Sequence, residues 1–361
     1  MRKLDIQELK DIMMGCTIMG TGGGGSLSEG LAVVEREWKE GKEFKLLEFH
    51  EIQDDAYYAS PYYCGCILPE EEEEEAVLDG RDIALSVEAL EQYMNKNFHG
   101  LVSIEYGGGN TGEVMAIAAM TGKYIVDADA AGRAVPELQF STYYVTEQPI
   151  TPLAVGTIYG DVAIIPKVKE DARAEALTRY MAVATKGTVG MTDHPISGKN
   201  LKTSVIPGAI TYAEKVGRAQ RIAIEQGKDP VQEILKATGG KLLFTGKVTK
   251  ETGWESRDGF TLGNIYLEGL GCDAGHTGRV WYKNENMMFW MDGKTRLTCP
   301  DLICVLERDT GIPVTNPNSK EGMELCVLGI PCHELWKTPR ALEILNPRFF
   351  GFDEDCVFLE E

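Results

Sequence analysis

The sequence predicts an α/β N-terminal domain with a parallel βαβ core, followed by a β-rich α+β C-terminal domain. In the first domain, a strand pattern at 101–105, a short buried helix pattern at 112–122 and a strand pattern at 124–128 follow one another as in a βαβ unit. In the second, residues 241–327 are mostly short strands separated by glycine and Asn/Asp turns. A length of 361 residues suits two domains, or three. We place the boundary between residues 165 and 166.

The N-terminal residues alternate between helix and strand patterns. Apolar side chains recur on one helical face from Leu4 to Cys16, with Asp5 and Glu8 as a capping pair at its start. Glycines end this helix, and Ser28 is expected to cap the next one. Before the βαβ unit we expect strands at 44–49 and 56–63 and a helix at 86–97. After it we expect strands at 153–166 and amphipathic helices at 170–185 and 210–227.

The composition restricts location and partners. A formal net charge of −20 argues against nucleic acid and anionic membranes as partners. Acidic residues interrupt any N-terminal secretory signal, and no stretch approaches the roughly 20 apolar residues of a membrane span. Nine scattered cysteines then indicate reduced thiols. We therefore expect a cytoplasmic homo-oligomer that acts on a small molecule.

A glycine triplet follows the strand at 101–105. Gly107, Gly108 and Gly109 allow a ligand to approach the backbone closely, and Asn110 or Thr111 is expected to cap the following helix. The free N–H groups of a helix N-terminus attract an anion or a polarised carbonyl. Residues 107–112 also match the G-x-G-x-x-G dinucleotide fingerprint, with an acid about 20 residues later. An NAD(P)-binding oxidoreductase is therefore one alternative, and a tight turn without a ligand is another.

Three carboxylates are expected at the same rim of the sheet. Glu105 ends one strand, Asp127 and Asp129 end its expected neighbour, and ligands collect at the carboxyl ends of strands in open α/β sheets. Several negative charges beside a pyrophosphate would repel it. The cluster therefore favours a metal ion, or a proton-transfer pair with separated pKa values. Capping, and salt bridges to Arg133, are the structural alternative.

Other segments suggest further contacts. The glycine run at 22–25 follows a helix rather than a strand, and we interpret it as a backbone-lined ligand wall, with a flexible hinge as the alternative. His194 lies beside Asp193, which could orient its imidazole. Cys64 and Cys66 share one face of a strand and could bind a soft cation, supply a nucleophile or simply be buried.

Two polar runs have competing interpretations. The six glutamates at 70–75 are expected to form a solvated loop or a helix start, with a cation-binding lip as the minor alternative. Residues 284–286 interrupt apolar strands, either as a hairpin turn or to project polar groups such as Asn284 into a cleft between domains.

Several motifs together resemble a known family. They are, in order, "GTGGGGS", "IEYGGGNT", "DADAAGRAVPELQ", "PGAITYAEKVGRA", "NEN", "PDLICVLERDTGIPV" and "LEILNPRFFGFD". Across nearly the entire chain, the set resembles the S-methyl-thiohydantoin desulfurase family, whose genes often accompany those of hydantoinases and oxoprolinases. The resemblance implies a two-domain, zinc-dependent hydrolase of a small cyclic imide or thiohydantoin. The residues that match the characteristic segments are Gly22, Gly23, Gly24, Gly25, Glu105, Gly107, Gly108, Gly109, Asn110, Asp127, Asp129, Arg133 and Glu137.

These observations lead to a hypothesis of metal-dependent hydrolysis. A divalent cation, expected to be zinc, is held by some of Glu105, Asp127 and Asp129, with His194 or a cysteine as a further ligand. It would lower the pKa of bound water, and a remaining carboxylate would act as general base.

The other predicted residues would contact the substrate. Asn110 and the glycine N–H groups would stabilise the oxyanion, and Arg133 would bind the ring carbonyl or hold the carboxylates. The glycine runs, Glu137 and Asn284 are expected to line the ligand site. A non-catalytic subunit of a hydantoinase- or oxoprolinase-type pathway is the second alternative.

Overall fold

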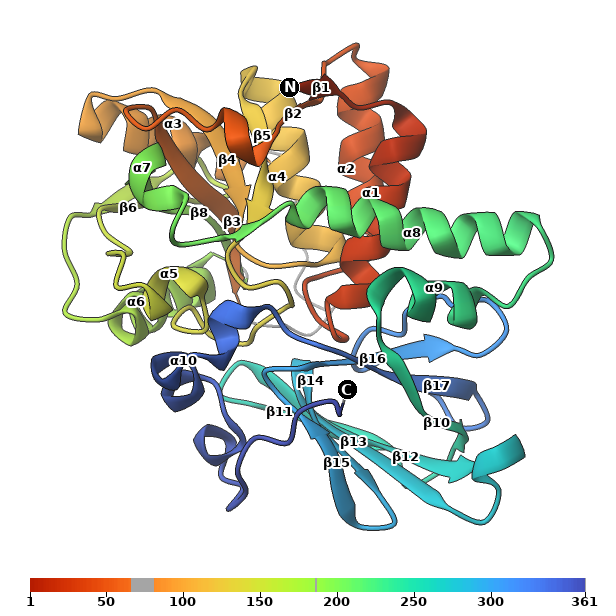
Figure 1. The fold of residues 1–361 in the computed structure, drawn as a ribbon. Coiled ribbons are helices and arrows are strands. Elements are labelled where there is room, and N and C mark those ends of the chain that lie inside the picture. Colours follow the sequence, from red (N-terminus) through yellow and green to blue (C-terminus); the bar gives the residue numbers. More distant parts are fainter. Residues whose placement is uncertain (66–80, 186, 361) are drawn as a thin grey trace.

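The computed structural model describes residues 1–65, 81–185 and 187–360. Two β-sheets organise the chain, and in Figure 1 the first sheet with most of the helices lies above the second. Cys66 and the glutamates at 70–75 lie outside the described residues. The mixed α/β first part and the β-rich second part agree with the predicted fold class.

The first sheet is mixed. Its strand order is β1-β2-β5-β4-β3-β8-β6-β7, with β9 paired to β5. Strands β2, β5, β4 and β3 are parallel neighbours, whereas β8, β6 and β7 pair antiparallel. The strands are β1 (Arg2–Lys3), β2 (Lys45–Leu47), β3 (Tyr57–Gly65), β4 (Phe98–Ser103), β5 (Tyr124–Asp129), β6 (Leu153–Gly156), β7 (Val162–Ile165), β8 (Thr188–Ser197) and β9 (Ile206–Pro207).

Most helices pack around this first sheet. Helix α4 connects the parallel strands β4 and β5, so a βαβ unit lies within the sheet. The helices are α1 (Ile6–Met19), α2 (Leu27–Lys39), α3 (Asp82–Met94), α4 (Gly108–Thr121), α5 (Thr142–Val145), α6 (Asp171–Ala184), α7 (Gly198–Leu201), α8 (Ala209–Glu225), α9 (Pro230–Thr238) and α10 (Pro339–Ile344). Short 3-10 turns are η1 (Phe49–Glu51), η3 (Gly271–Asp273), η4 (Glu334–Lys337) and η5 (Pro347–Phe350).

The helix starts follow local capping chemistry. Helix α1 begins at the predicted capping box, in which the Asp5 carboxylate accepts from the Glu8 N–H and the Glu8 carboxylate from the Asp5 N–H. Helix α2 is capped by Ser26, which accepts from the Glu29 N–H. Ser28 is therefore not the cap that the sequence suggested, because the chain is already helical at Leu27.

The second sheet is antiparallel throughout. Its strand order is β15-β14-β13-β12-β10-β17-β16, with β11 paired to β12. Phe244, Ile265, Val280 and Phe289 lie in its buried cluster. The strands are β10 (Lys241–Val248), β11 (Gly253–Arg257), β12 (Phe260–Gly269), β13 (Thr277–Lys283), β14 (Glu285–Met291), β15 (Lys294–Thr298), β16 (Leu302–Glu307) and β17 (Glu324–Ile330).

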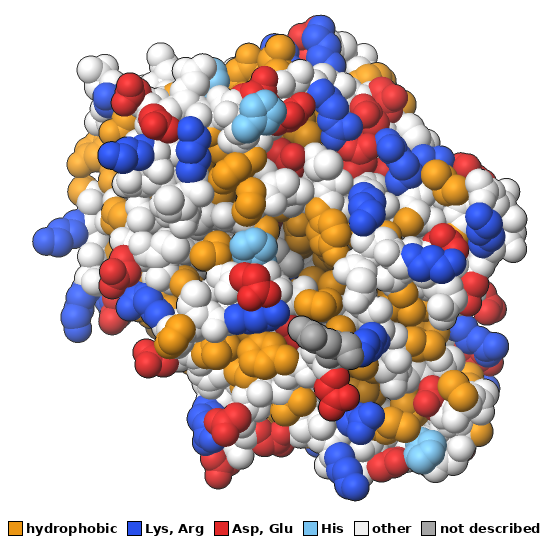
Figure 2. Space-filling model, viewed as in Figure 1, with side chains coloured by type: hydrophobic (Ala, Val, Ile, Leu, Met, Phe, Trp, Pro, Cys, Tyr) orange, Lys and Arg blue, Asp and Glu red, His pale blue; other side chains and the backbone are white. Residues whose placement is uncertain are grey.

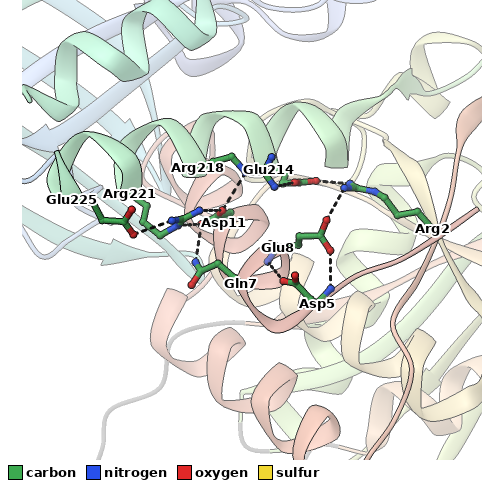
Figure 3. A network of polar contacts seen from close by, with 9 residues as sticks. All are labelled: Arg2, Asp5, Gln7, Glu8, Asp11, Glu214, Arg218, Arg221 and Glu225. Atoms are coloured by element: carbon green, nitrogen blue, oxygen red, sulfur yellow. Dashed lines mark hydrogen bonds and ion pairs between the residues drawn. The ribbon is translucent and has the colours of Figure 1, made fainter.

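Helices α1 and α8 are joined by a network of charged side chains (Figure 3). Asp11 on α1 accepts two hydrogen bonds of 2.8 Å from Arg221 on α8, and Arg2 bridges Glu8 and Glu214. This network fixes α8 against α1, and Arg2 connects both helices to β1 of the first sheet. The first sheet contains residues on both sides of the predicted boundary at 165 and 166, because β8 and β9 belong to it.

The surface and the cysteines have simple properties. Acidic and basic side chains are interspersed over the face drawn in Figure 2. The eight cysteines within the described ranges are free thiols. None of the described helices combines the length and the apolar character that a bilayer crossing needs.

Candidate functional site

A cavity of about 1100 Å³ is lined by both parts of the chain. The first part contributes the loop before α2, the end of β3 and the turn between β4 and α4. The second contributes the turns around β12, β14 and residue 316. Among the predicted site residues, those in the lining are Gly22, Gly23, Gly24, Gly25, Glu105, Gly109, Asn110, Glu137 and Asn284.

The glycine loop, residues 20–25, joins the two parts of the chain at this cavity. The Thr21 carbonyl oxygen accepts from the Asn286 N–H at 2.7 Å, and the Gly22 carbonyl oxygen accepts from the Asn316 N–H at 2.8 Å. A Cβ at Gly23 would lie 2.0 Å from Glu285 Oε1. The loop is therefore packed against the second sheet as a wall of the cavity, and its contacts favour the wall over the hinge.

The same loop covers the start of α4. The Gly24 carbonyl oxygen accepts from the N–H groups of Gly109 and Asn110, at 2.9 and 3.1 Å. Gly24 has φ +76°, and a Cβ on it would lie 2.4 Å from the Cα of Gly107. The two glycine runs thus pack backbone against backbone, and these two helix N–H groups are not free to bind a phosphate or an oxyanion.

The cap of α4 differs from the prediction. The N-cap is Gly107, and the Thr111 hydroxyl accepts from the Gly107 N–H at 3.2 Å. Neither Asn110 nor Thr111 is the N-cap residue, because the helix begins at Gly108. The Asn110 side chain instead reaches Glu105, which follows β4.

Glu105 is a buried carboxylate with two donors. Its Oε1 accepts from Asn110 Nδ2 at 2.7 Å and its Oε2 from the Val135 N–H at 2.7 Å. Burial raises the pKa of Glu105 to about 7, and these two hydrogen bonds oppose the rise. The ionised form is therefore accessible near neutral pH and has its donors in place.

Glu285 is another buried carboxyl in the lining, which also contains Glu175 in an ion pair with Arg179. Burial raises its pKa well above the usual value, and the charge on Glu105 raises it further. Its Oε2 has no hydrogen-bond partner among the described residues. Glu105 holds the charge more easily because it has two donors, so the proton of this pair resides on Glu285.

Asp127 lies outside this cavity. Its Oδ1 accepts from the Thr211 N–H at 2.9 Å and its Oδ2 from the Thr211 hydroxyl at 2.6 Å. Thr211 is in the first turn of α8, so Asp127 satisfies a helix N–H there. The predicted gathering of Asp127 with Glu105 at one rim is not what the structure shows, because the side chain of Asp127 faces α8.

Asp129 is also outside the lining. Its Oδ1 accepts from the N–H groups of Ala131 and Gly132, at 2.8 and 2.5 Å, which fixes the turn after β5. Burial raises the pKa of Asp129 to about 6. Its charge raises the pKa of Glu105, so Asp129 acts on the site through space.

Arg133 is fully buried and joins the two parts of the chain. Its guanidinium donates to the backbone oxygens of Pro300, Asp301 and Asn286, at 3.2, 3.1 and 2.9 Å. These bonds replace the predicted contacts with a ring carbonyl or with carboxylates. The positive charge still favours the ionised forms of Glu105 and Glu285.

His194 lies in β8, away from the lining, and not in a loop. Its Nδ1 is 2.8 Å from Asp193 Oδ1, as the sequence suggested, and its ring stacks on Tyr143 at 4.4 Å between centroids. Cys64 does line the cavity, but burial raises the pKa of its thiol to about 12. A protonated thiol is a poor nucleophile, so we assign Cys64 no chemical role.

The predicted zinc ligands do not form a metal site in the described residues. Glu105, Asp127 and Asp129 bind separate backbone or side-chain donors, and His194 is bound to Asp193. In the ranges that the structure covers, no group of three His, Cys, Asp or Glu side chains is arranged to hold a metal ion. We therefore derive no reaction step through a metal.

The remaining predicted residues, Glu137 and Asn284, are held by contacts of their own in the lining. Glu137 forms an ion pair with Lys283. Asn284 adopts φ +56° and is held to β12, since its Oδ1 accepts from the Thr261 N–H at 2.8 Å. Asn284 is thus the turn between β13 and β14, and Glu285, the first residue of β14, lies in the lining. The sequence signal for Glu285 was an acidic residue among otherwise apolar strand residues. A polar projection into a cleft was one of the two interpretations given for residues 284–286, and a hairpin turn was the other.

Comparison with known proteins gives the family. A model described as S-Me-THD-like, N-terminal domain, matches residues 7–167, and one described as S-Me-THD-like, C-terminal domain, matches residues 169–359. A crystal structure of a protein from Chromobacterium violaceum, determined by the Northeast Structural Genomics Consortium, has a similar fold. The TM-score is 0.77 at 20% identity, over 99% of each chain. No match was found among curated proteins. The chain therefore belongs to the S-Me-THD-like family, the family of S-methyl-thiohydantoin desulfurase.

Proposed function

We propose that this protein hydrolyses a small cyclic imide or an S-methylthiohydantoin-like compound, with Glu105 as general base and Glu285 as general acid. The family supports the substrate class, and one observation carries the chemistry. Of the three buried carboxyls in the lining, Glu105 and Glu285 have environments that separate their protonation states, whereas Glu175 is paired with Arg179. A carboxylate and a carboxylic acid at one site are the requirement for concerted proton transfer.

The pair can complete a hydrolysis without a further reactant. Water adds to the electrophilic ring carbon, its proton passes to Glu105, and Glu285 gives its proton to the ring nitrogen. When the adduct collapses, the hydroxyl proton returns to Glu285 while a carbonyl forms. For an S-methylthio carbon, the C–S bond breaks and methanethiol leaves with the proton from Glu105. For a cyclic imide, the ring C–N bond breaks instead, the product is a carboxylate, and Glu105 releases its proton to solvent. In both cases the two carboxyls then have their starting protonation states.

The surrounding residues orient the pair. Asn110 and the Val135 N–H fix the Glu105 carboxylate, so its free lone pairs have a defined direction. Gly23 leaves space for the Glu285 carboxyl, which a Cβ would occupy. Asn110 is thus a positioning residue for the base rather than part of an oxyanion site.

The test uses two isosteric substitutions. Glu105→Gln and Glu285→Gln are expected to lower kcat for S-methylthiohydantoin by about 100-fold or more each, since proton transfer contributes about 10²–10⁴-fold. Thiol release and ring opening are followed separately. Asp127→Asn is the matched control, because this carboxylate faces α8, and its kcat should equal that of the wild type. A double variant with wild-type kcat would refute the proposal, and elemental analysis of each preparation tests for metal.

The oxidoreductase alternative has less support. A pyrophosphate at the start of α4 would need the N–H groups that Gly24 occupies. Titration with reduced nicotinamide cofactor, followed by fluorescence, should therefore show no binding. A non-catalytic subunit is the other alternative, and it would be favoured if the Glu105→Gln and Glu285→Gln variants left pathway flux unchanged.

A further inference from the structure

Two hydrogen-bonded asparagine side chains, those of Asn286 and Asn316, lead from the second sheet to the cavity. Asn286, which is fully buried, donates from Nδ2 to the Ile303 carbonyl oxygen at 2.9 Å. Its Oδ1 accepts from Asn316 Nδ2 at 3.0 Å, and that nitrogen also donates to the Asn284 carbonyl oxygen at 2.8 Å. Each of the two amides therefore has only one orientation that satisfies its neighbours.

This fixed orientation gives Asn316 a defined role at the cavity. Since Asn316 Nδ2 is committed to two acceptors, its Oδ1 is the remaining group, and it can only accept a hydrogen bond. Asn316 lines the cavity, and its Oδ1 has no partner among the described residues and is shielded from solvent. A buried acceptor of this kind is costly unless a donor meets it.

A second unpartnered group lies nearby. Thr261 also lines the cavity, is 2% exposed, and its hydroxyl has no partner within the described ranges. The Thr261 N–H binds the Asn284 side chain, and the Asn316 side chain binds the Asn284 backbone. Both groups therefore flank Asn284, the residue before the proposed acid Glu285.

We propose that Asn316, held in one orientation by Asn286, selects ligands with an unsubstituted ring N–H and is a specificity-determining residue of this site. This inference rests on the proposed function, because it places a cyclic amide-like ligand beside Glu285. The N–H of the ring donates to Asn316 Oδ1, and Thr261 contacts an adjacent polar atom. Methylation of that nitrogen removes the donor and leaves the acceptor unpaired.

The test compares hydantoin with 1-methylhydantoin and 3-methylhydantoin by calorimetric titration of the full chain. One of the two methyl isomers is expected to bind about 10- to 100-fold more weakly than hydantoin, the effect of leaving a buried acceptor unpaired. Asn316→Leu should bind hydantoin about 10- to 100-fold more weakly than the wild type does. Its affinities for the two isomers should differ from its affinity for hydantoin by less than about threefold. Thr261→Val is the second variant, and it should retain the preference for the free N–H.

The outcomes separate this inference from the proposed function. Equal binding of all three compounds to the wild type, or an unchanged preference in Asn316→Leu, overturns the role of Asn316 even if turnover is measured. A preference that depends on Asn316, in a protein that hydrolyses neither these compounds nor S-methylthiohydantoin, supports the recognition role and refutes the hydrolase. If Asn316→Leu does not fold, Asn316→Ala takes its place, and a preference for the free N–H that persists in Asn316→Ala overturns the role of Asn316.

Discussion

Replacing Gly24 by alanine should destabilise the protein more than the same change at Gly41. The two glycines have nearly the same backbone angle, φ +76° and φ +78°. Alanine in this region costs about 1–2 kcal/mol at either position. At Gly41 no atom lies within 4 Å of the added Cβ, so that cost is the whole effect.

At Gly24 the added Cβ would lie 2.4 Å from the Cα of Gly107 and 2.5 Å from the Tyr106 carbonyl oxygen. Both atoms are backbone and cannot rotate away, so overpacking adds about 1–3 kcal/mol. We expect the free energy of unfolding to fall by about 1–2 kcal/mol for Gly41→Ala and by about 2–5 kcal/mol for Gly24→Ala. Urea unfolding, extrapolated to water, measures both. Equal losses for the two variants would refute the packing of the two glycine runs.

Three further results are expected. Burial raises the pKa of Glu105 to about 7. Because the base must be ionised, kcat/KM should rise as the pH increases toward that value and level off above it. A flat profile of kcat/KM from about pH 5 to 8 would contradict the role of Glu105 as base. Asp127→Ala should lower the free energy of unfolding by about 0.5–2 kcal/mol, the effect of losing a capping acceptor, with kcat unchanged. Arg133→Lys should lower the free energy of unfolding by about 3 kcal/mol or more, since an ammonium cannot donate to the same set of buried carbonyl oxygens. A variant with the thermal stability of the wild type would argue against this role of Arg133.

The sequence predicted the elements of the fold well because their signals are local. Capping by Asp5 and Glu8, and the strand-helix-strand pattern around α4, depend on neighbouring residues. The position of β8 in the first sheet depends instead on pairing with β3 and β6, which are distant in the chain. No local pattern reports such pairing, and the boundary between residues 165 and 166 stays a prediction that rests on the change of sequence pattern.

The site was only partly predictable for the same reason. Glu105 and Gly109 line the cavity because they follow strand β4 of the first sheet. Asp127 also follows the expected pattern, but the direction of its side chain is set by α8, which begins about 80 residues later. Glu285 and Asn316 come from the second sheet, and their place in the lining depends on the glycine loop that contacts them.

The contact between the glycine loop and the second sheet has a consequence for biosynthesis. A ribosome releases Gly22 and Glu105 long before Glu285 and Asn316, because chains emerge from the N-terminal end. A nascent chain that has folded only its first sheet therefore has the proposed base, Glu105, without the proposed acid, Glu285, and a loop with unpaired carbonyl oxygens. Chemistry at this centre must wait until nearly all of the polypeptide has been made.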